Sequence, residues 1–136
     1  MLYRVKGRIV SGTGEGSYYV SLKPYYKFFT HILGYPPYPG TLNIVVDEKS
    51  YCFIVSRILR LKGIKIQAFK YLKHNFCSAL CYPIYVSGTL PGLIVYPLVE
   101  GREHSHRCIL EVISPYYLRG VLGLSDGDMV ELLIPS

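Results

Sequence analysis

The chain has 136 residues, of which 50% are hydrophobic, and carries a formal net charge of +6. This length suits a single domain, residues 1–136, with one core, and the apolar content excludes a disordered chain. The apolar runs fall short of the ~18–20 residues that cross a membrane, and the first residues suit a strand better than a signal peptide. We therefore expect a soluble, cytoplasmic protein with an anionic partner, such as nucleotide phosphates, nucleic acid or anionic lipid.

The predicted elements are mostly short strands. Apolar or β-branched runs separated by turn signals predict strands at 2–10, 18–22, 41–46, 51–59, 63–70, 79–87, 92–98, 107–113 and 129–134. One helix is expected at 24–34, and a second opens at Ser114-Pro115 and ends near residues 120–123. Short strands at this spacing favour an all-β barrel with small helices, and the lack of long amphipathic helices argues against a doubly wound α/β fold.

A glycine-dense loop follows the first predicted strand. Within residues 11–18, Gly12, Gly14 and Gly16 alternate with other residues, and glycine lets successive backbone N–H groups approach one anion. The segment is not a Walker loop, because Gly16 is followed by Ser17 rather than Lys, and Ser17 also breaks the dinucleotide-binding pattern. A phosphate cradle and a flexible hairpin loop both remain open.

Thr41 and Asn43 lie two residues apart in the strand predicted at 41–46. Their side chains should therefore share one face while Leu42 faces the core. Two neutral oxygens could bind Mg²⁺, which takes few protein ligands and completes its shell with water and phosphates. The alternative is a strand with polar residues facing solvent.

Three further features carry candidate chemistry. Glu111 interrupts the apolar run at 109–113 and is either exposed or a pocket carboxylate that accepts bonds from a substrate hydroxyl. Residues 114–119 bring Arg119 near a helix N-terminus, which suits an anion or a base edge, or form an ordinary capped helix. His104 and His106 could share a strand face, although no third metal ligand accompanies them. The four cysteines, at 52, 77, 81 and 108, are expected to be buried free thiols.

In combination, residues 7–22, 33–43, 91–97, 110–119 and 124–128 resemble the archaeal CTP-dependent riboflavin kinase family. The resemblance implies a six-stranded cradle-loop (RIFT-type) β-barrel. It also implies transfer of the γ-phosphate of CTP to the 5′-hydroxyl of riboflavin, with Mg²⁺, to give FMN and CDP. Some members carry an N-terminal winged-helix domain, which we do not expect in this chain.

The resemblance also implies roles for particular residues. By match to the family's motif, the nucleotide would be lined by Thr13, Gly14, Glu15, Gly16, Ser17, Tyr18, Tyr116, Tyr117, Leu118 and Arg119. Thr41 and Asn43 would hold Mg²⁺, and Glu111 would contact the flavin. Glu103 stands where the family often has a flavin-contacting Thr, and a carboxylate there would repel a phosphate. Glu111 is also our candidate catalytic residue, as a general base or as a group that orients the hydroxyl.

Two alternatives to the kinase stay open. One is a non-catalytic basic β-barrel that binds nucleic acid or a protein partner, and the other is a flavin- or nucleotide-binding relative without activity. The scattered charge, and the concentration of Gly, Thr and Asn in two motifs, favour the kinase over a nucleic-acid binder. We expect riboflavin and CTP as partners, a monomer, and no membrane or nucleic acid. Few amides and many prolines indicate a thermophilic source.

Overall fold

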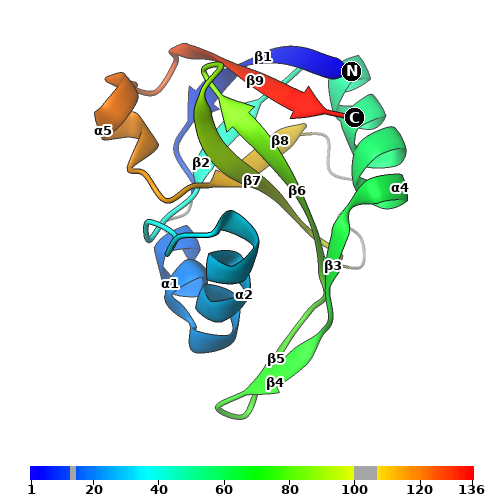
Figure 1. Cartoon of the computed structure of the whole chain (residues 1–136), viewed down its shortest axis with the longest axis vertical. Helices are drawn as coiled ribbons and strands as arrows, with labels where there is room; N and C mark the ends of the chain where they lie inside the picture. The colour runs from blue at the N-terminus through cyan, green and yellow to red at the C-terminus, as the bar shows by residue number, and fades with distance from the viewer. Residues whose placement is uncertain (13–14, 100–106) are drawn as a thin grey trace.

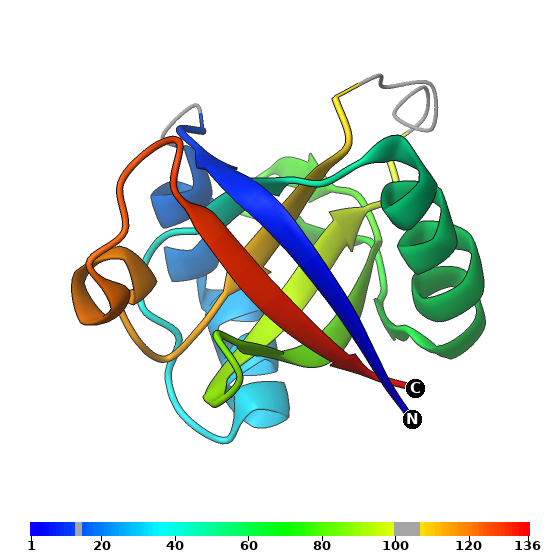
Figure 2. The same ribbon diagram turned by 90° about the horizontal axis from the view of Figure 1, so that it is seen from above.

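A closed antiparallel barrel forms the body of the computed structural model, which describes residues 1–12, 15–99 and 107–136. Its six strands are β1 (Leu2–Val10), β2 (Leu42–Val45), β6 (Ala79–Val86), β7 (Leu90–Pro97), β8 (Ile109–Ile113) and β9 (Met129–Pro135). They follow the order β6-β7-β8-β2-β1-β9, and β9 returns to β6 through Tyr85↔Leu133 and Val86↔Leu132 (Figures 1 and 2). The expected all-β, six-stranded barrel is confirmed.

Alternation along the strands fills the barrel. In β1, Val5 and Ile9 point inward and are buried while Lys6 and Arg8 between them are exposed, as the two-residue period of a strand requires. The inner core is apolar, and its fully buried members include Ile9, Ile44, Ile94, Leu132 and Ile134. Such a core, closed on all sides by strands, provides a rigid wall on which an outer site can be built.

Two helices cover part of the outer face of the barrel. Helix α1 (Glu15–Ser21) and helix α2 (Lys23–Leu33) bury Val20 and Phe29 against Leu93 and Ile113, which point outward from β7 and β8. Helix α2 begins with a proline in its first turn and ends at Gly34, whose φ of 82° is left-handed, so the helix predicted at 24–34 is confirmed.

The strand predicted at 18–22 was wrong, because this segment belongs to helix α1. Gly16 and Val20 face the barrel while Ser17, Tyr18 and Tyr19 between them are exposed, and this spacing of four residues is helical rather than extended. The segment packs its one buried side chain, Val20, against the outer face of the sheet.

The strand predicted at 51–59 was also wrong, because residues 48–62 form one helical segment. It consists of α3 (Glu48–Phe53), the π-helical η1 (Ile54–Leu59) and α4 (Arg60–Lys62). Asp47 caps its start, accepting a bond of 2.8 Å from the backbone N–H of Ser50. The buried residues Ile54, Val55, Ile58 and Leu59 recur at helical spacing and join the inner core.

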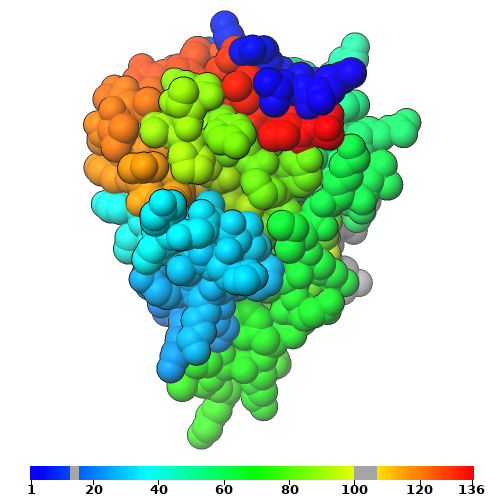
Figure 3. Space-filling view, in the orientation of Figure 1, coloured from blue at the N-terminus to red at the C-terminus, as the bar shows by residue number. Residues whose placement is uncertain are grey.

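The strand predicted at 63–70 is split in two. Strand β3 (Ile64–Ile66) pairs with β6, whereas β4 (Phe69–Tyr71) pairs with β5 (His74–Phe76) in a separate hairpin. Leu72 and Lys73 form the hairpin turn with φ of 51° and 66°, as expected of a two-residue turn with positive φ at both positions. The hairpin projects from the barrel beside α1 and α2 (Figures 1 and 3).

Helix α5 (Leu118–Leu122) begins later than predicted, since its N-cap residue is Tyr117. Ser114 is buried and donates a 2.7 Å bond to the carbonyl of Pro91 on β7, so it holds the chain to the barrel and does not cap α5. The helix ends at Gly123 as predicted, with φ of 64°. In the described part of the chain, no helix has the length and apolar character needed to cross a membrane.

Candidate functional site

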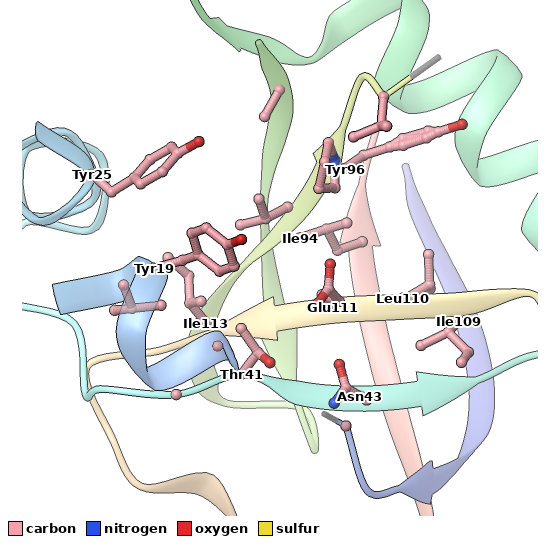
Figure 4. A pocket seen from close by; sticks show the side chains of 18 of the residues that line it. Tyr19, Tyr25, Thr41, Asn43, Ile94, Tyr96, Ile109, Leu110, Glu111 and Ile113 are labelled. Carbon is pink, nitrogen blue, oxygen red and sulfur yellow. The ribbon is translucent and has the colours of Figure 1, made fainter. Parts of the chain in front are cut away.

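Asn43 of β2 and Glu111 of β8 lie directly opposite each other across the paired strands. Their side chains face the outside of the barrel, because the alternating neighbours Leu42 and Ile44 belong to the inner core, and this confirms the predicted orientation of Leu42. Asn43 is nevertheless only 9% exposed. Figure 4 shows Thr41, Asn43 and Glu111 along the same pocket.

The glycine loop packs directly against Thr41, which precedes β2, and Asn43 of β2. A Cβ built on Gly12 would lie 2.2 Å from Nδ2 of Asn43, and one on Gly16 would lie 2.6 Å from Oγ1 of Thr41. Both distances are far shorter than a van der Waals contact, so a side chain at 12 or 16 would displace Asn43 or Thr41. Two motifs about 25 residues apart in the sequence therefore form one site.

The pocket has a volume of about 1000 Å³. It extends from the glycine loop, across Asn43 and Glu111, to side chains of α1, α2 and β5. Glu111 lies centrally in this arrangement, because its register partners are Asn43 on β2 and Val95 on β7. A ligand with two chemically different ends could therefore contact the side-chain oxygens of Asn43 and Glu111 with one end and the side chains of α1, α2 and β5 with the other.

Aromatic rings form the far side of the pocket, and we call Tyr19, Tyr25, Phe69 and Phe76 the aromatic wall. Ring centroids of Tyr25 lie 4.9 Å from Phe69 and 5.9 Å from Phe76, and Tyr19 lies 6.3 Å from Phe76. Tyr19, Tyr25 and Phe76 line the pocket, and Figure 4 shows the first two. Burial raises the pKa of Tyr25 to about 12, so its phenol stays protonated even in alkaline solution.

Arg119 lies at the other end of the pocket, where α5 meets the end of β1. Its Nη2 donates to Oδ1 of Asp126 at 2.7 Å and to the carbonyl of Val10 at 3.4 Å. Ser11 donates to Oδ2 of the same carboxylate. These bonds from Ser11 and Arg119 hold the pKa of Asp126 below its usual value, so the carboxylate stays charged.

The remaining residues expected around α5 differ in orientation. Tyr116 and Tyr117 are about half exposed, and Tyr117 stacks on Tyr38 with ring centroids 4.8 Å apart. Together with Thr41 they line a second hollow of about 220 Å³. The side chain of Leu118 is buried in the inner core, so only its backbone is available to a ligand.

Some predicted site residues lie outside the described residues: Thr13, Gly14, Glu103, His104 and His106, together with the side chain of Glu15. Ser17 lines the pocket, and Tyr18 is exposed and meets the ring of Tyr19 edge to face. The roles assigned to these residues stay predictions.

The structure also locates the cysteines. All four are free, but only Cys81 is buried, and burial raises the pKa of its thiol to about 12. Cys52 and Cys77 are exposed, so the expectation of buried thiols was wrong for these two. Within the ranges that the structure describes, no group of three or more His, Cys, Asp or Glu side chains could hold a metal.

The oxygen donors on β2, on β8 and at the residue before β2 fit a hard cation. Thr41 and Asn43 supply neutral oxygens on one face, and Glu111 supplies a carboxylate in register with Asn43. Mg²⁺ prefers oxygen ligands, uses few from the protein, and keeps sites for water and phosphate. The residues present therefore suit Mg²⁺ better than a metal that prefers His and Cys.

The sequence pointed to the polar end of the pocket but not to its aromatic wall. That wall joins α1, α2, β4 and β5, which come together only in the folded chain. The one local signal is the pair Tyr25 and Phe29, which lie four residues apart on α2 and stack with centroids 5.7 Å apart. Asp126 was not among the candidate site residues.

Fold and site together define a small closed β-barrel with an outer pocket lined by glycine, oxygen donors and aromatic rings. Residues 9–134 match the family model CTP-dep_RFKase, described as "Domain of unknown function DUF120". The chain is 43% identical over 129 residues to a protein named riboflavin kinase from Archaeoglobus fulgidus and 40% identical over 134 residues to one from Ignicoccus hospitalis. A riboflavin kinase from Sulfurisphaera tokodaii is 35% identical over 133 residues.

The chain therefore belongs to the archaeal CTP-dependent riboflavin kinase family. These matches cover 95–96% of this chain. The chain spans 53% of the length of the Archaeoglobus protein, 70% of the Ignicoccus protein and 94% of the Sulfurisphaera protein.

Proposed function

We propose that this chain is a riboflavin kinase that transfers the γ-phosphate of CTP to the 5′-hydroxyl of riboflavin, giving FMN and CDP. The observation that carries the proposal is the packing of Gly12 and Gly16 onto Asn43 and Thr41, beside Glu111. This arrangement joins a backbone suited to phosphates with oxygen donors suited to Mg²⁺. The name of the relatives supports riboflavin as acceptor, and the name of the family supports CTP as donor.

The nucleotide would occupy the end of the pocket formed by the glycine loop, β2 and Arg119. Backbone N–H groups of the loop and the guanidinium of Arg119 would bind its phosphates. Thr41 and Asn43 would hold Mg²⁺, which when bound neutralises charge that develops on the phosphates. The hollow between Tyr38 and Tyr116 would take the nucleoside, since it shares Thr41 and Arg119 with the larger pocket.

Riboflavin would lie across Glu111, with its ring system against the aromatic wall. A flat tricyclic ring suits stacked and edge-on contacts with Tyr19, Tyr25 and Phe76. The ribityl chain would then run toward Glu111 and bring its 5′-hydroxyl to the phosphate end of the pocket. Glu111 would orient that hydroxyl or accept its proton.

The transfer is a simple displacement. The 5′-hydroxyl oxygen forms a bond to the γ-phosphorus, and the bond from that phosphorus to the bridging oxygen of the β-phosphate breaks. CDP leaves with the electrons of that bond, and the hydroxyl proton passes to Glu111 or to water. Such a reaction depends on positioning and charge neutralisation more than on covalent help from the protein.

The test is chromatographic detection of FMN after incubating the protein with riboflavin, Mg²⁺ and either CTP or ATP. FMN formed with CTP and little formed with ATP would support both the activity and the donor. No FMN with any nucleotide or divalent metal would refute the kinase and favour a binding protein. Glu111→Gln should lower FMN formation. Its matched control is Glu131→Gln, because this change removes a carboxylate that pairs with Arg4, outside the pocket.

Binding of the flavin ring has its own test. Tyrosine rings in contact with a flavin quench its fluorescence by electron transfer, so riboflavin fluorescence should fall when the protein is added. Phe76→Ala should weaken this binding by roughly tenfold, in line with the loss of one aromatic contact. Tyr35→Ala, which removes a ring that is 67% exposed and does not line the pocket, is the control.

A further inference from the structure

Two segments of the proposed nucleotide site converge on one carboxylate, that of Asp126. Ser11, the first residue of the glycine loop, donates its hydroxyl to Oδ2. Arg119, on α5, donates from Nη2 to Oδ1 at 2.7 Å. The two segments are more than 100 residues apart in the sequence, and Asp126 is the group that bonds to a side chain from each.

The guanidinium of Arg119 is held by two hydrogen bonds. The same Nη2 that pairs with Asp126 also donates to the carbonyl of Val10 at 3.4 Å, at the end of β1. A guanidinium has five N–H donors, so these bonds leave capacity for a phosphate. The side chain is 28% exposed and lines both hollows, which is where a phosphate-binding group would have to be.

The turn that carries Asp126 is itself fixed to β1. The N–H of Gly127 donates to the carbonyl of Ile9 at 2.8 Å, and the N–H of Ile9 donates to the carbonyl of Asp128 at 2.9 Å. Oδ2 of Asp128 accepts from the N–H of Ser125 at 2.8 Å, which closes the turn. Asp126 therefore lies in a turn that is hydrogen-bonded to β1, the strand that leads into the glycine loop.

A carboxylate close to a phosphate-binding site is unfavourable unless its charge is compensated, because the negative charge repels the phosphates. Here the charge is matched by Arg119, and the pair orders a long side chain that would otherwise sample many rotamers. A side chain ordered before the ligand arrives loses less conformational entropy on binding, which increases affinity.

We propose that Asp126 is a positioning residue for the nucleotide: it holds Arg119 at the pocket edge and ties it, through Ser11, to the start of the glycine loop. Asp126 does not itself contact the nucleotide. This inference rests on the proposed function, since it concerns the nucleotide end of the same pocket. It concerns affinity for the nucleotide and not the chemical step.

The first experiment compares wild type with Asp126→Asn, which keeps the size of the side chain and removes its charge. Calorimetric titration with CDP and Mg²⁺, which is not turned over, should give a dissociation constant about tenfold weaker. In steady-state assays KM for CTP should rise by a similar factor, with kcat and KM for riboflavin changed less than about threefold. Thermal unfolding of the variant verifies that the fold is intact.

The matched control is Glu131→Gln. It removes another arginine–carboxylate pair, Arg4 to Glu131 at 3.1 Å, from the same end of the chain but away from the pocket. Nucleotide binding should be unchanged in this variant. A control that loses CDP affinity as much as Asp126→Asn does would show a general effect of charge and overturn the proposal.

A double-variant cycle tests the route of the effect. If Asp126 acts through Arg119, then Asp126→Asn should cost little further affinity in an Arg119→Gln background, and the two losses should not multiply. Multiplying losses, or wild-type affinity in Asp126→Asn, would overturn the inference while the kinase proposal stands. If wild type binds no CDP, the proposed function and this inference both fall.

Discussion

Replacing Gly12 by alanine should inactivate the protein without removing any functional group. The new Cβ would lie 2.2 Å from Nδ2 of Asn43. To restore an ordinary contact near 3.4 Å, the two groups must separate by about 1.2 Å. The atom in the way is the tip of a side chain and not backbone, so we expect the Asn43 amide to move while the strand stays in place.

The size of the effect follows from that displacement. A shift of about 1 Å in a positioning group costs on the order of 100-fold in rate, which corresponds to about 2.7 kcal/mol of transition-state stabilisation. Inserting a methyl group into a packed contact costs about 1–3 kcal/mol of folding stability. Gly12→Ala should therefore lower kcat/KM about 100-fold and lower the unfolding midpoint by roughly 3–12 °C.

The assay is FMN formation from riboflavin and CTP, measured well below the unfolding midpoint. Gly7→Ala is the comparison, because it makes the same change within β1, where the new Cβ would meet Cγ2 of Ile44 at 2.3 Å and the backbone carbonyl of Val45 at 2.7 Å instead of Asn43. It should lose stability more than activity. Wild-type kcat/KM in a folded Gly12→Ala protein would refute the link between the glycine loop and Asn43.

Four further outcomes are expected. Asn43→Ala should abolish Mg²⁺-dependent turnover with the fold intact by circular dichroism, and retained activity would remove the metal assignment. Glu111→Gln should lower kcat, and full activity from pH 5 to 9 would exclude a general base. Burial raises the pKa of Tyr25 to about 12, so as the pH rises the unfolded chain loses this phenolic proton before the folded protein does. The free energy of unfolding, measured by urea titration, should therefore fall between about pH 10 and 12. The fall should be smaller in Tyr25→Phe, and an equal fall in that variant would contradict the assignment. Cys81, with its pKa raised to about 12 by burial, should resist a thiol reagent at pH 8 that modifies the exposed cysteines, and rapid modification in the native state would contradict its burial.

Local patterns predicted the barrel strands well because the interior of the barrel is apolar and much of its outer face is exposed to solvent. In β1 the alternation of Val5, Ile9 and the charged residues between them has one interpretation, and the strand runs from Leu2 to Val10 as expected. The polar pair Thr41 and Asn43 was likewise assigned correctly to the outer face. In these places the local period and the tertiary environment agree.

The helical segment at 48–62 was missed because an apolar run of 51–59 suits a buried strand and a buried helix equally. The deciding signal lies upstream: Asp47 is followed three residues later by Ser50, whose N–H it caps. The buried positions Ile54 and Ile58 then recur four residues apart. Composition without this capping signal favoured the wrong element.

The burial of Asn43 could not be predicted from its strand. Alternation places the side chain outside the barrel, and Gly12, arriving from the end of β1, packs onto it there. The aromatic wall is missing from the sequence analysis for the same reason, since Tyr25 and Phe76 come together through two segments that do not pair locally. Sites built on the outer face of a barrel depend on such long-range contacts.

The barrel is closed by the last strand of the chain, and this affects how the protein folds. Strand β9 pairs with β1 from Leu2↔Pro135 to Arg8↔Met129 and with β6 through two further residue pairs. Pairings this distant in sequence slow folding, because the entropy cost of closing a long loop comes before the pairing contacts that offset it. During synthesis, β1 and β6 must wait with open edges until residues 129–135 leave the ribosome, and those edges are the surfaces most exposed to aggregation.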